Sequence, residues 1–238
     1  MKHYLKWPGN NFGDKLNDII FPQLGIDSCI PYTKPNLVNV PKNTMLGLGT
    51  LLSQKVASNV TVLGSGSDGS RKPKIKLDYR FVRGKLTANF LNLDSKLAVG
   101  DTAYFLKDYI QNLSTTKEYD IGIIPHHSND KITSGHNVIS PTLPIDQFIA
   151  ETSKYKIILA EAMHGAICAD ILRIPWSPIS INSDRYPIQK FKWQDWASMF
   201  DINLTFGNLK SYTTYLSSDK NLNSVSNNVR QLMISATS

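Results

Sequence analysis

Cysteine is scarce in this sequence: its 238 residues contain only Cys29 and Cys168. Two cysteines supply neither a disulfide framework nor a cysteine-rich zinc site, so a reducing compartment is expected. The N-terminal residues 1–9 hold no apolar core long enough for a signal peptide. No stretch of the chain approaches the roughly 20 apolar residues of a membrane span. The sequence therefore predicts a cytoplasmic protein.

Acidic residues are also few, since 19 Asp and Glu stand against 26 Lys and Arg and leave a formal net charge of +7. This excess favours anionic partners, which include phosphorylated small molecules, nucleic acid and an acidic membrane surface. Metal motifs are missing as well. His126 and His127 are adjacent, and on an extended segment they would point to opposite sides, with only one of them facing a cleft. We predict no metal and no cofactor.

What the sequence does contain is a repeated alternation of short apolar strands and helices. It predicts an α/β protein with two Rossmann-like halves that face a cleft. The polar residues 114–118 resemble a linker, so we expect an N-terminal domain over 1–115 and a C-terminal domain over 116–238 with a closing helix. Residues 28–44 are expected to be largely loop and residues 97–101 a short strand.

The second half is arranged around residues 155–176, which read as a buried strand that turns into a helix ended by Pro175. Glu161, His164 and Gly165 occupy the turn. A helix N-terminus at the carboxyl end of a parallel strand attracts anions, so His164 could transfer a proton beside a bound phosphate. The alternative is a core histidine whose ring nitrogens bond the backbone.

Three other turns carry polar groups after short apolar strands. Asn11, Gly13 and Asp14 open a helix, where Asn11 and Asp14 either bind a ligand or only cap. Ser65, Gly66 and Ser67 lie in a glycine-rich turn that could hold phosphate or carboxylate, or could be a mobile surface loop. Arg83 follows a strand, where it could grip an anion with two donors or form a surface salt bridge.

The segment Ala160-Glu161-Ala162-Met163-His164-Gly165-Ala166 with Ala169-Asp170 and Arg173-Ile174-Pro175-Trp176 resembles the signature of polysaccharide pyruvyltransferases, in particular the exopolysaccharide ketal-forming branch. Other segments follow in the family's order: Asn11-Phe12-Gly13-Asp14, Gly47-Leu48-Gly49-Thr50-Leu51, Gly64-Ser65-Gly66-Ser67, Val82-Arg83-Gly84, Gly122-Ile123-Ile124-Pro125-His126 and residues 190–196. The resemblance covers roughly residues 10–200. It implies a GT-B-like architecture, trimmed at this length. Lys85 and Thr102 stand where the family commonly has proline.

The resemblance implies that a pyruvyl group passes from phosphoenolpyruvate to two hydroxyls of one sugar, giving a cyclic ketal and free phosphate. In that reading His164 is the acid/base group, Arg83 the anion clamp and His126 an acceptor-side or second proton-transfer group. The expected substrate-binding residues are Asn11, Gly13, Asp14, Ser65, Gly66, Ser67, Glu161 and Gly165. The acceptor is expected to be a lipid-linked saccharide at the inner face of the membrane. The basic residues Arg71, Lys72, Lys74 and Lys76 would then touch anionic lipid; the alternative is that this charge run is only a solvated surface.

Two other functions compete with this one. The first is a nucleotide-sugar glycosyltransferase on the same architecture. The second is a non-catalytic basic module that binds nucleic acid, but the lysines are not interleaved with aromatic residues in a nucleic-acid motif, so no such partner is expected.

Overall fold

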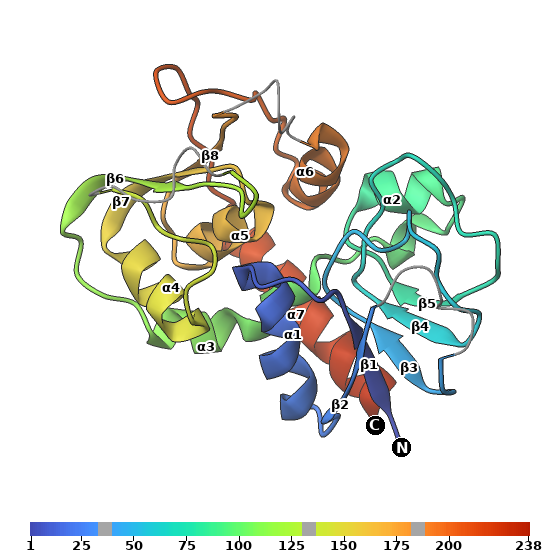
Figure 1. Cartoon of the computed structure of the whole chain (residues 1–238). Helices are drawn as coiled ribbons and strands as arrows, with labels where there is room; N and C mark the ends of the chain where they lie inside the picture. The colour runs from blue at the N-terminus through green and yellow to red at the C-terminus, as the bar shows by residue number, and fades with distance from the viewer. Residues whose placement is uncertain (33–39, 130–136, 182–188) are drawn as a thin grey trace.

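The computed structural model describes residues 1–32, 40–129, 137–181 and 189–238. In these residues the strands form two sheets (Figure 1). One sheet has five strands in the order β2-β1-β3-β4-β5 and the other three in the order β6-β7-β8. Every pairing between named strands is parallel. The predicted α/β class is thus confirmed.

The strands are β1 (His3–Lys6), β2 (Ser28–Pro31), β3 (Thr44–Leu46), β4 (Val60–Leu63), β5 (Asp78–Phe81), β6 (Tyr119–Ile124), β7 (Tyr155–Ala160) and β8 (Trp176–Pro178). The α-helices are α1 (Phe12–Gln23), α2 (Lys85–Phe90), α3 (Lys107–Asn112), α4 (Ile145–Ser153), α5 (Met163–Ile171), α6 (Lys190–Ala197) and α7 (Asp219–Thr237). Three short 3-10 helices are η1 (Ser95–Leu97), η2 (Thr102–Leu106) and η3 (Ser198–Phe200).

Successive residues of the first sheet enter two different cores, because side chains alternate between the faces of a strand. Tyr4 and Met45 belong to a large core, whereas their neighbours Leu5 and Leu46 belong to a smaller one. The smaller core is closed by residues of 51–57 and of α2. The large core continues through α1, α4 and α5 into the second sheet, so one hydrophobic interior joins the two sheets.

Helix α1 connects the two halves of the molecule. It packs against β1 of the first sheet and also against α4 and α5, which flank the second (Figure 1). The rings of Phe12 and Phe148 stack with centroids 4.1 Å apart, and the amide of Phe12 donates to the carbonyl of Pro141 at 2.7 Å. The first turn of α1 is therefore held directly by the second half.

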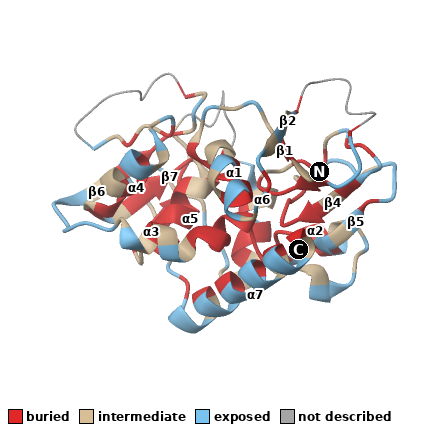
Figure 2. Cartoon of the chain, turned by 90° about the horizontal axis from the view of Figure 1, so that it is seen from below, coloured by how far each residue is buried: buried red, intermediate tan, exposed pale blue. Residues whose placement is uncertain are grey.

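The C-terminal helix α7 packs against η2 and β5 of the N-terminal part. Its buried side faces the interior and its other side is exposed (Figure 2). The C-terminal helix that the sequence predicts is present as α7. The division at residues 114–118 falls between α3 and β6 and stays a prediction.

One sequence-based expectation about elements was wrong. Residues 97–101 form no strand: η1 ends at Leu97, and a single bridge joins Val82 to Ala98. Strand β2 was not predicted: it lies in the segment 28–44, which was expected to be largely loop, and it pairs with β1 along the sheet edge. Pro31 is tolerated there since an edge strand leaves one side without ladder bonds. Residues 33–39 of that segment lie outside the described residues. None of the helices in the described ranges is long and apolar enough to cross a membrane.

Candidate active site

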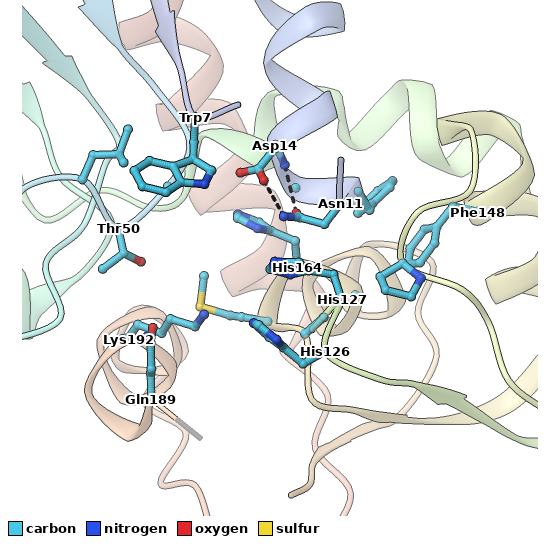
Figure 3. Close-up of a pocket in the computed structure, with 18 of the residues that line it drawn as sticks. Trp7, Asn11, Asp14, Thr50, His126, His127, Phe148, His164, Gln189 and Lys192 are labelled. Atoms are coloured by element: carbon cyan, nitrogen blue, oxygen red, sulfur yellow. Dashed lines mark hydrogen bonds between the residues drawn. The ribbon is translucent and has the colours of Figure 1, made fainter. Parts of the chain in front are cut away.

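A pocket of about 250 Å³ lies where loops of the two sheets meet (Figure 3). The first half contributes the start of α1 and the loop after β3, and the second half contributes the turns after β6 and β7. Six of the predicted site residues line it, namely Asn11, Gly13, Asp14, His126, His164 and Gly165. Five others, Ser65, Gly66, Ser67, Arg83 and Glu161, are not among the lining residues.

His164 sits in the first turn of α5, directly after the carboxyl end of β7, as the sequence predicts. Its ring lies against Gly13 of α1, where a Cβ atom would overlap the imidazole Nδ1. Its side chain is 18% exposed, although Nε2 itself is buried. Glycine at position 13 thus leaves the space in which the histidine of the second half reaches the first.

Asp101 lies behind His164, with its Oδ1 3.5 Å from Nε2 of the imidazole. The carboxylate is fully buried, and its Oδ1 accepts a bond from the amide of Ala103 at 3.0 Å. Burial by itself would raise the pKa of Asp101, but His164, Arg83 and the Ala103 amide hold that pKa below its usual range. The two ring nitrogens of His164 thus face different groups, Nε2 the Asp101 carboxylate and Nδ1 the backbone at Gly13.

The first turn of α1 is both capped and part of the pocket. The side chain of Asn11 accepts the Asp14 amide at 3.1 Å, and its own amide group donates to the Asp14 carboxylate. Burial raises the pKa of Asp14, while His164 and His127 oppose the shift. The two readings of Asn11 and Asp14, capping and ligand binding, are therefore compatible.

His126 and His127 both line the pocket, so the expectation that only one would face it was wrong. The residues after β6 form a turn rather than an extended segment, and the alternation of strand side chains does not apply. Burial, with His127 and Lys192 nearby, lowers the pKa of His126 to about 4. His126 is consequently neutral at physiological pH.

Glu161 holds this part of the site together through backbone groups. Its carboxylate accepts the amide of His126 at 3.0 Å, the side chain of Asn129 at 2.8 Å and the amide of Ile181 at 2.6 Å. It thereby joins the turn after β6 to the segment after β8. In this arrangement Glu161 positions His126 from outside the pocket.

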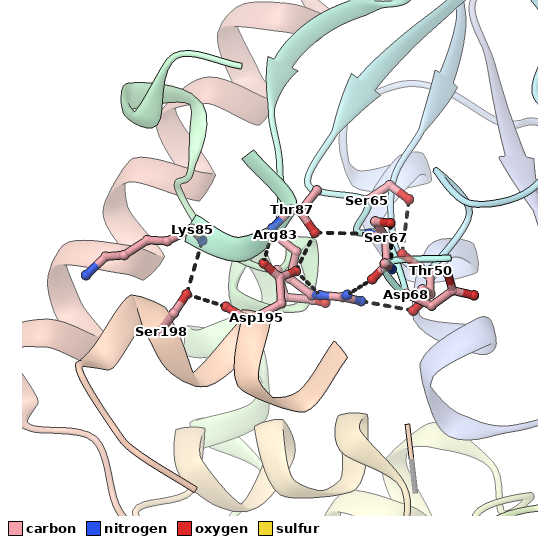
Figure 4. A network of polar contacts seen from close by, with 12 residues as sticks. Thr50, Ser65, Ser67, Asp68, Arg83, Lys85, Thr87, Asp195 and Ser198 are labelled. Atoms are coloured by element: carbon pink, nitrogen blue, oxygen red, sulfur yellow. Dashed lines mark hydrogen bonds and ion pairs between the residues drawn. The ribbon is translucent and has the colours of Figure 1, made fainter. Parts of the chain in front are cut away.

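The glycine-rich turn after β4 is buried rather than a surface loop (Figure 4). Its hydroxyls bond within the protein: Ser65 donates to the Gly49 carbonyl at 3.0 Å, and Ser67 and Ser53 share a bond of 2.7 Å. A Cβ atom at Gly66 would overlap the Arg83 guanidinium. The turn therefore packs against the Arg83 guanidinium and does not form a phosphate-binding loop at the surface.

Arg83 is fully buried and uses all three guanidinium nitrogens (Figure 4). Nε pairs with Asp195 of α6 at 2.9 Å, Nη1 donates to the Thr50 hydroxyl at 3.0 Å, and Nη2 donates to the Ser67 carbonyl at 2.8 Å. Of these partners only Thr50 lines the pocket. The surface salt bridge considered for Arg83 becomes a buried one between the two halves.

Lys192 is the pocket cation that sequence reasoning did not select. It lines the pocket from α6 together with Gln189 (Figure 3). Burial and the charge of Arg83 lower the pKa of its ammonium to about 8, with Asp14 and Asp101 acting in the opposite direction. Residues 190–196 formed part of the family resemblance, which was the available signal. Sequence reasoning also did not select Asp101, although it follows Gly100 at the end of a predicted strand, the position that drew attention to the other site residues.

Several known proteins are similar to this chain. Residues 76–183 match the family model described as polysaccharide pyruvyl transferase. The chain is 29% identical over 218 residues to the succinoglycan biosynthesis protein ExoV of Rhizobium meliloti (strain 1021), with 84% of this chain and 65% of that protein covered. It is 24% identical over 233 residues to the uncharacterized protein L143 of Acanthamoeba polyphaga mimivirus, covering 91% and 79%.

Among solved structures, a functionally uncharacterized protein from Klebsiella pneumoniae is similar with a TM-score of 0.47 and 14% identity, covering 86% of this chain and 92% of that one. The match to the family model and the similarity to ExoV confirm the resemblance predicted from the sequence. The chain spans about two thirds of the length of ExoV.

Proposed function

We propose that the chain is a polysaccharide pyruvyltransferase, as its similarity to the family model over residues 76–183 and to ExoV supports, and that it transfers a pyruvyl group from phosphoenolpyruvate to two hydroxyls of a sugar during exopolysaccharide biosynthesis. The products are a cyclic pyruvate ketal and free phosphate. The observation that carries the proposal is the buried Asp101 behind His164 in a pocket built by both halves. A GT-B-like, trimmed architecture is part of the same proposal.

The reaction needs an acid that protonates the methylene carbon of phosphoenolpyruvate. We assign this role to His164, because it lines the pocket with Nε2 facing the buried Asp101 carboxylate and Nδ1 facing Gly13. The first turn of α5 adds positive potential for the donor's anionic groups. No cofactor or metal enters this scheme.

The reaction also needs a base for the sugar hydroxyls. Asp14 is suited to it, because burial raises the pKa of its carboxyl group toward neutral pH, which makes the carboxylate a stronger base. His126, neutral at physiological pH, is a second acceptor-side group. Arg83 and the turn at Ser65, Gly66 and Ser67 act from behind the pocket wall through Thr50.

The test is incubation of the purified chain with phosphoenolpyruvate and a panel of free and lipid-linked sugars. We expect release of phosphate that depends on the acceptor, and a product whose mass shows one added pyruvyl group. A parallel incubation with nucleotide sugars tests the glycosyltransferase alternative. Glycosyl transfer in that arm, without pyruvylated product in the first, would replace the proposal.

A further inference from the structure

Lys192 is a half-buried lysine, and its ammonium forms no hydrogen bond and no ion pair with any residue in the described ranges. Its side chain points into the pocket from α6 (Figure 3). Removing a charge from water is unfavourable unless an opposite charge replaces the lost hydration. An ammonium group held in the pocket without a protein partner is suited to bind an anionic ligand.

The charges around Lys192 favour the binding of an anion. The positive charge of Arg83 disfavours the charged form of Lys192, whereas the carboxylates of Asp14 and Asp101 favour it. His126, which is also nearby, is neutral. Neither carboxylate forms an ion pair with it, since Asp101 faces His164 and Asp14 bonds Asn11. The balance leaves room for one or more negative charges.

A second feature of the same pocket points to an anion. The first turn of α5 lines it through Ala162, Met163, His164 and Gly165. The N-cap position is Ala162, which offers no side-chain acceptor, and no acceptor in the described part of the chain is seen for the amides of Met163 and His164. Such amides bind oxyanions, so donors from α5 and the ammonium from α6 converge on one space.

The buried Arg83–Asp195 pair places Lys192. Asp195 follows Lys192 by three residues on α6, and residues at this spacing share a side of a helix. Asp195 also accepts the amide of Thr87 at 2.7 Å and the hydroxyl of Thr87 at 2.6 Å, which caps α2 from another helix. Trp196 of α6 donates to the Tyr104 hydroxyl at 2.9 Å. These contacts fix α6 relative to the first half.

We propose that Lys192 binds the carboxylate or phosphate of the donor, and that the Arg83–Asp195 pair positions it for this contact. The identity of the donor as phosphoenolpyruvate rests on the proposed function, whereas the presence of an oxyanion site does not. Lys192 is then the anion-binding cation of the pocket, and Arg83 is a positioning residue.

Calorimetric titration with phosphoenolpyruvate, inorganic phosphate and pyruvate tests the proposal and separates the two anionic groups of the donor. We expect Lys192→Met to weaken phosphoenolpyruvate binding about 10- to 100-fold, the usual value of a hydrogen bond to a charged group. Lys190→Met is the matched control, because Lys190 is exposed on the same helix and does not line the pocket; its binding should be unchanged. If Lys192→Met weakens the binding of inorganic phosphate, Lys192 contacts the phosphate of the donor; if it weakens the binding of pyruvate, Lys192 contacts the carboxylate.

The pH dependence gives a readout that a purely structural lysine would not move. Wild-type affinity should fall as pH rises through about 8, where the free ammonium loses its proton, and Lys192→Arg should bind over the whole range because arginine keeps its charge. The melting temperature of Lys192→Met should not fall, since an unpartnered half-buried charge is removed.

Equal affinity of wild type and Lys192→Met for phosphoenolpyruvate would overturn this inference and leave the proposed function standing. Binding of phosphate that is lost in Lys192→Met, with no turnover of phosphoenolpyruvate by the wild type, would support the anion site and remove the proposed function. A wild type that binds none of the three probes would overturn the anion site.

Discussion

At the scale of single residues, the site depends on His164 and on the two groups that confine its ring, Asp101 and Gly13. The His164→Ala variant should lower turnover about 10²- to 10⁴-fold, the usual contribution of a general acid/base, and leave the fold intact. His3→Gln is the control, because His3 lies on β1 and does not line the pocket. Phosphate release and a thermal melt measure both effects. Near-normal turnover in His164→Ala would return this histidine to a packing role.

Gly13 offers an independent test of the same geometry. A methyl group at this position would overlap His164 Nδ1, so the imidazole would have to move. Gly13→Ala should therefore lower turnover about 10²-fold, since displacing a catalytic group by about 1 Å can cost that much. It should also lower the melting temperature, because overpacking outweighs the better helix propensity of alanine. Asn10→Ala, at an exposed neighbouring position, should change neither quantity. Full activity in Gly13→Ala would show that His164 need not occupy its present place.

His126 makes the stability of the fold depend on pH in a defined direction. Its pKa is about 4 in the folded chain and about 6.5 in an unfolded one. Between these values the unfolded chain binds more protons, so the contribution of His126 lowers the free energy of unfolding as pH falls from 6.5 to 4. Urea denaturation across this range should show a shallower decline for His126→Asn than for the wild type. Parallel declines would mean that His126 is not desolvated in the fold.

Sequence reasoning located the groups that follow strands, but it could not see which of them turn toward the pocket. His164, His126 and the start of α1 were found because each follows a short apolar strand, and parallel strands bring such positions to one edge. Arg83 also follows a strand, but Asp195, 112 positions away in the chain, takes its guanidinium. Lys192 was missed for the same reason: a lysine on a helix reads as solvent-facing until the partner surface is known.

At the scale of elements, the contact between α2 and α6 is the feature that joins the halves behind the pocket (Figure 4). Removing one partner of a buried ion pair costs about 3 to 5 kcal/mol, because the other charge stays buried. Asp195→Ala should lower the free energy of unfolding by about this amount. The control is Lys85→Ala, which breaks the exposed Lys85–Asp201 pair and should cost at most about 1 kcal/mol. Urea denaturation measures both, and equal small losses would mean that the buried pair contributes little.

The alternation of strands and helices was predictable from apolar patterns, and residues 155–176 form a strand, β7, that leads into a helix, α5, as predicted. The differences from prediction concern elements that depend on distant neighbours. Strand β2 has little apolar pattern of its own and forms because β1 offers an edge. Residues 97–101 carry a strand-like pattern, but Asp101 caps η2 instead. Local patterns fix such segments poorly because tertiary contacts decide between the alternatives.

At the scale of the whole molecule, the positive charge is gathered partly on one surface beside the pocket. Arg71, Lys72 and Lys74 are exposed and, with Lys55, line a hollow whose remaining residues include Ile75, itself 37% exposed. Gln54 lines both this hollow and the pocket. A saccharide in the pocket that is carried on a lipid diphosphate would therefore have its anionic link near these basic side chains.

We propose on this basis that the protein associates with anionic membranes, near whose surface basic residues contribute about 1 kcal/mol each. We expect the protein to bind anionic liposomes at low salt, and binding to weaken as salt shortens the range of the interaction. Replacing Arg71, Lys72, Lys74 and Lys76 by Gln should reduce binding. Replacing Lys85, Lys156, Lys210 and Lys220, which are exposed elsewhere, removes the same charge and should matter less. Liposome co-sedimentation measures all three proteins. Equal losses in the two variants would assign binding to net charge alone, and a wild type that ignores anionic liposomes at low salt would remove membrane association while leaving the pocket chemistry untouched.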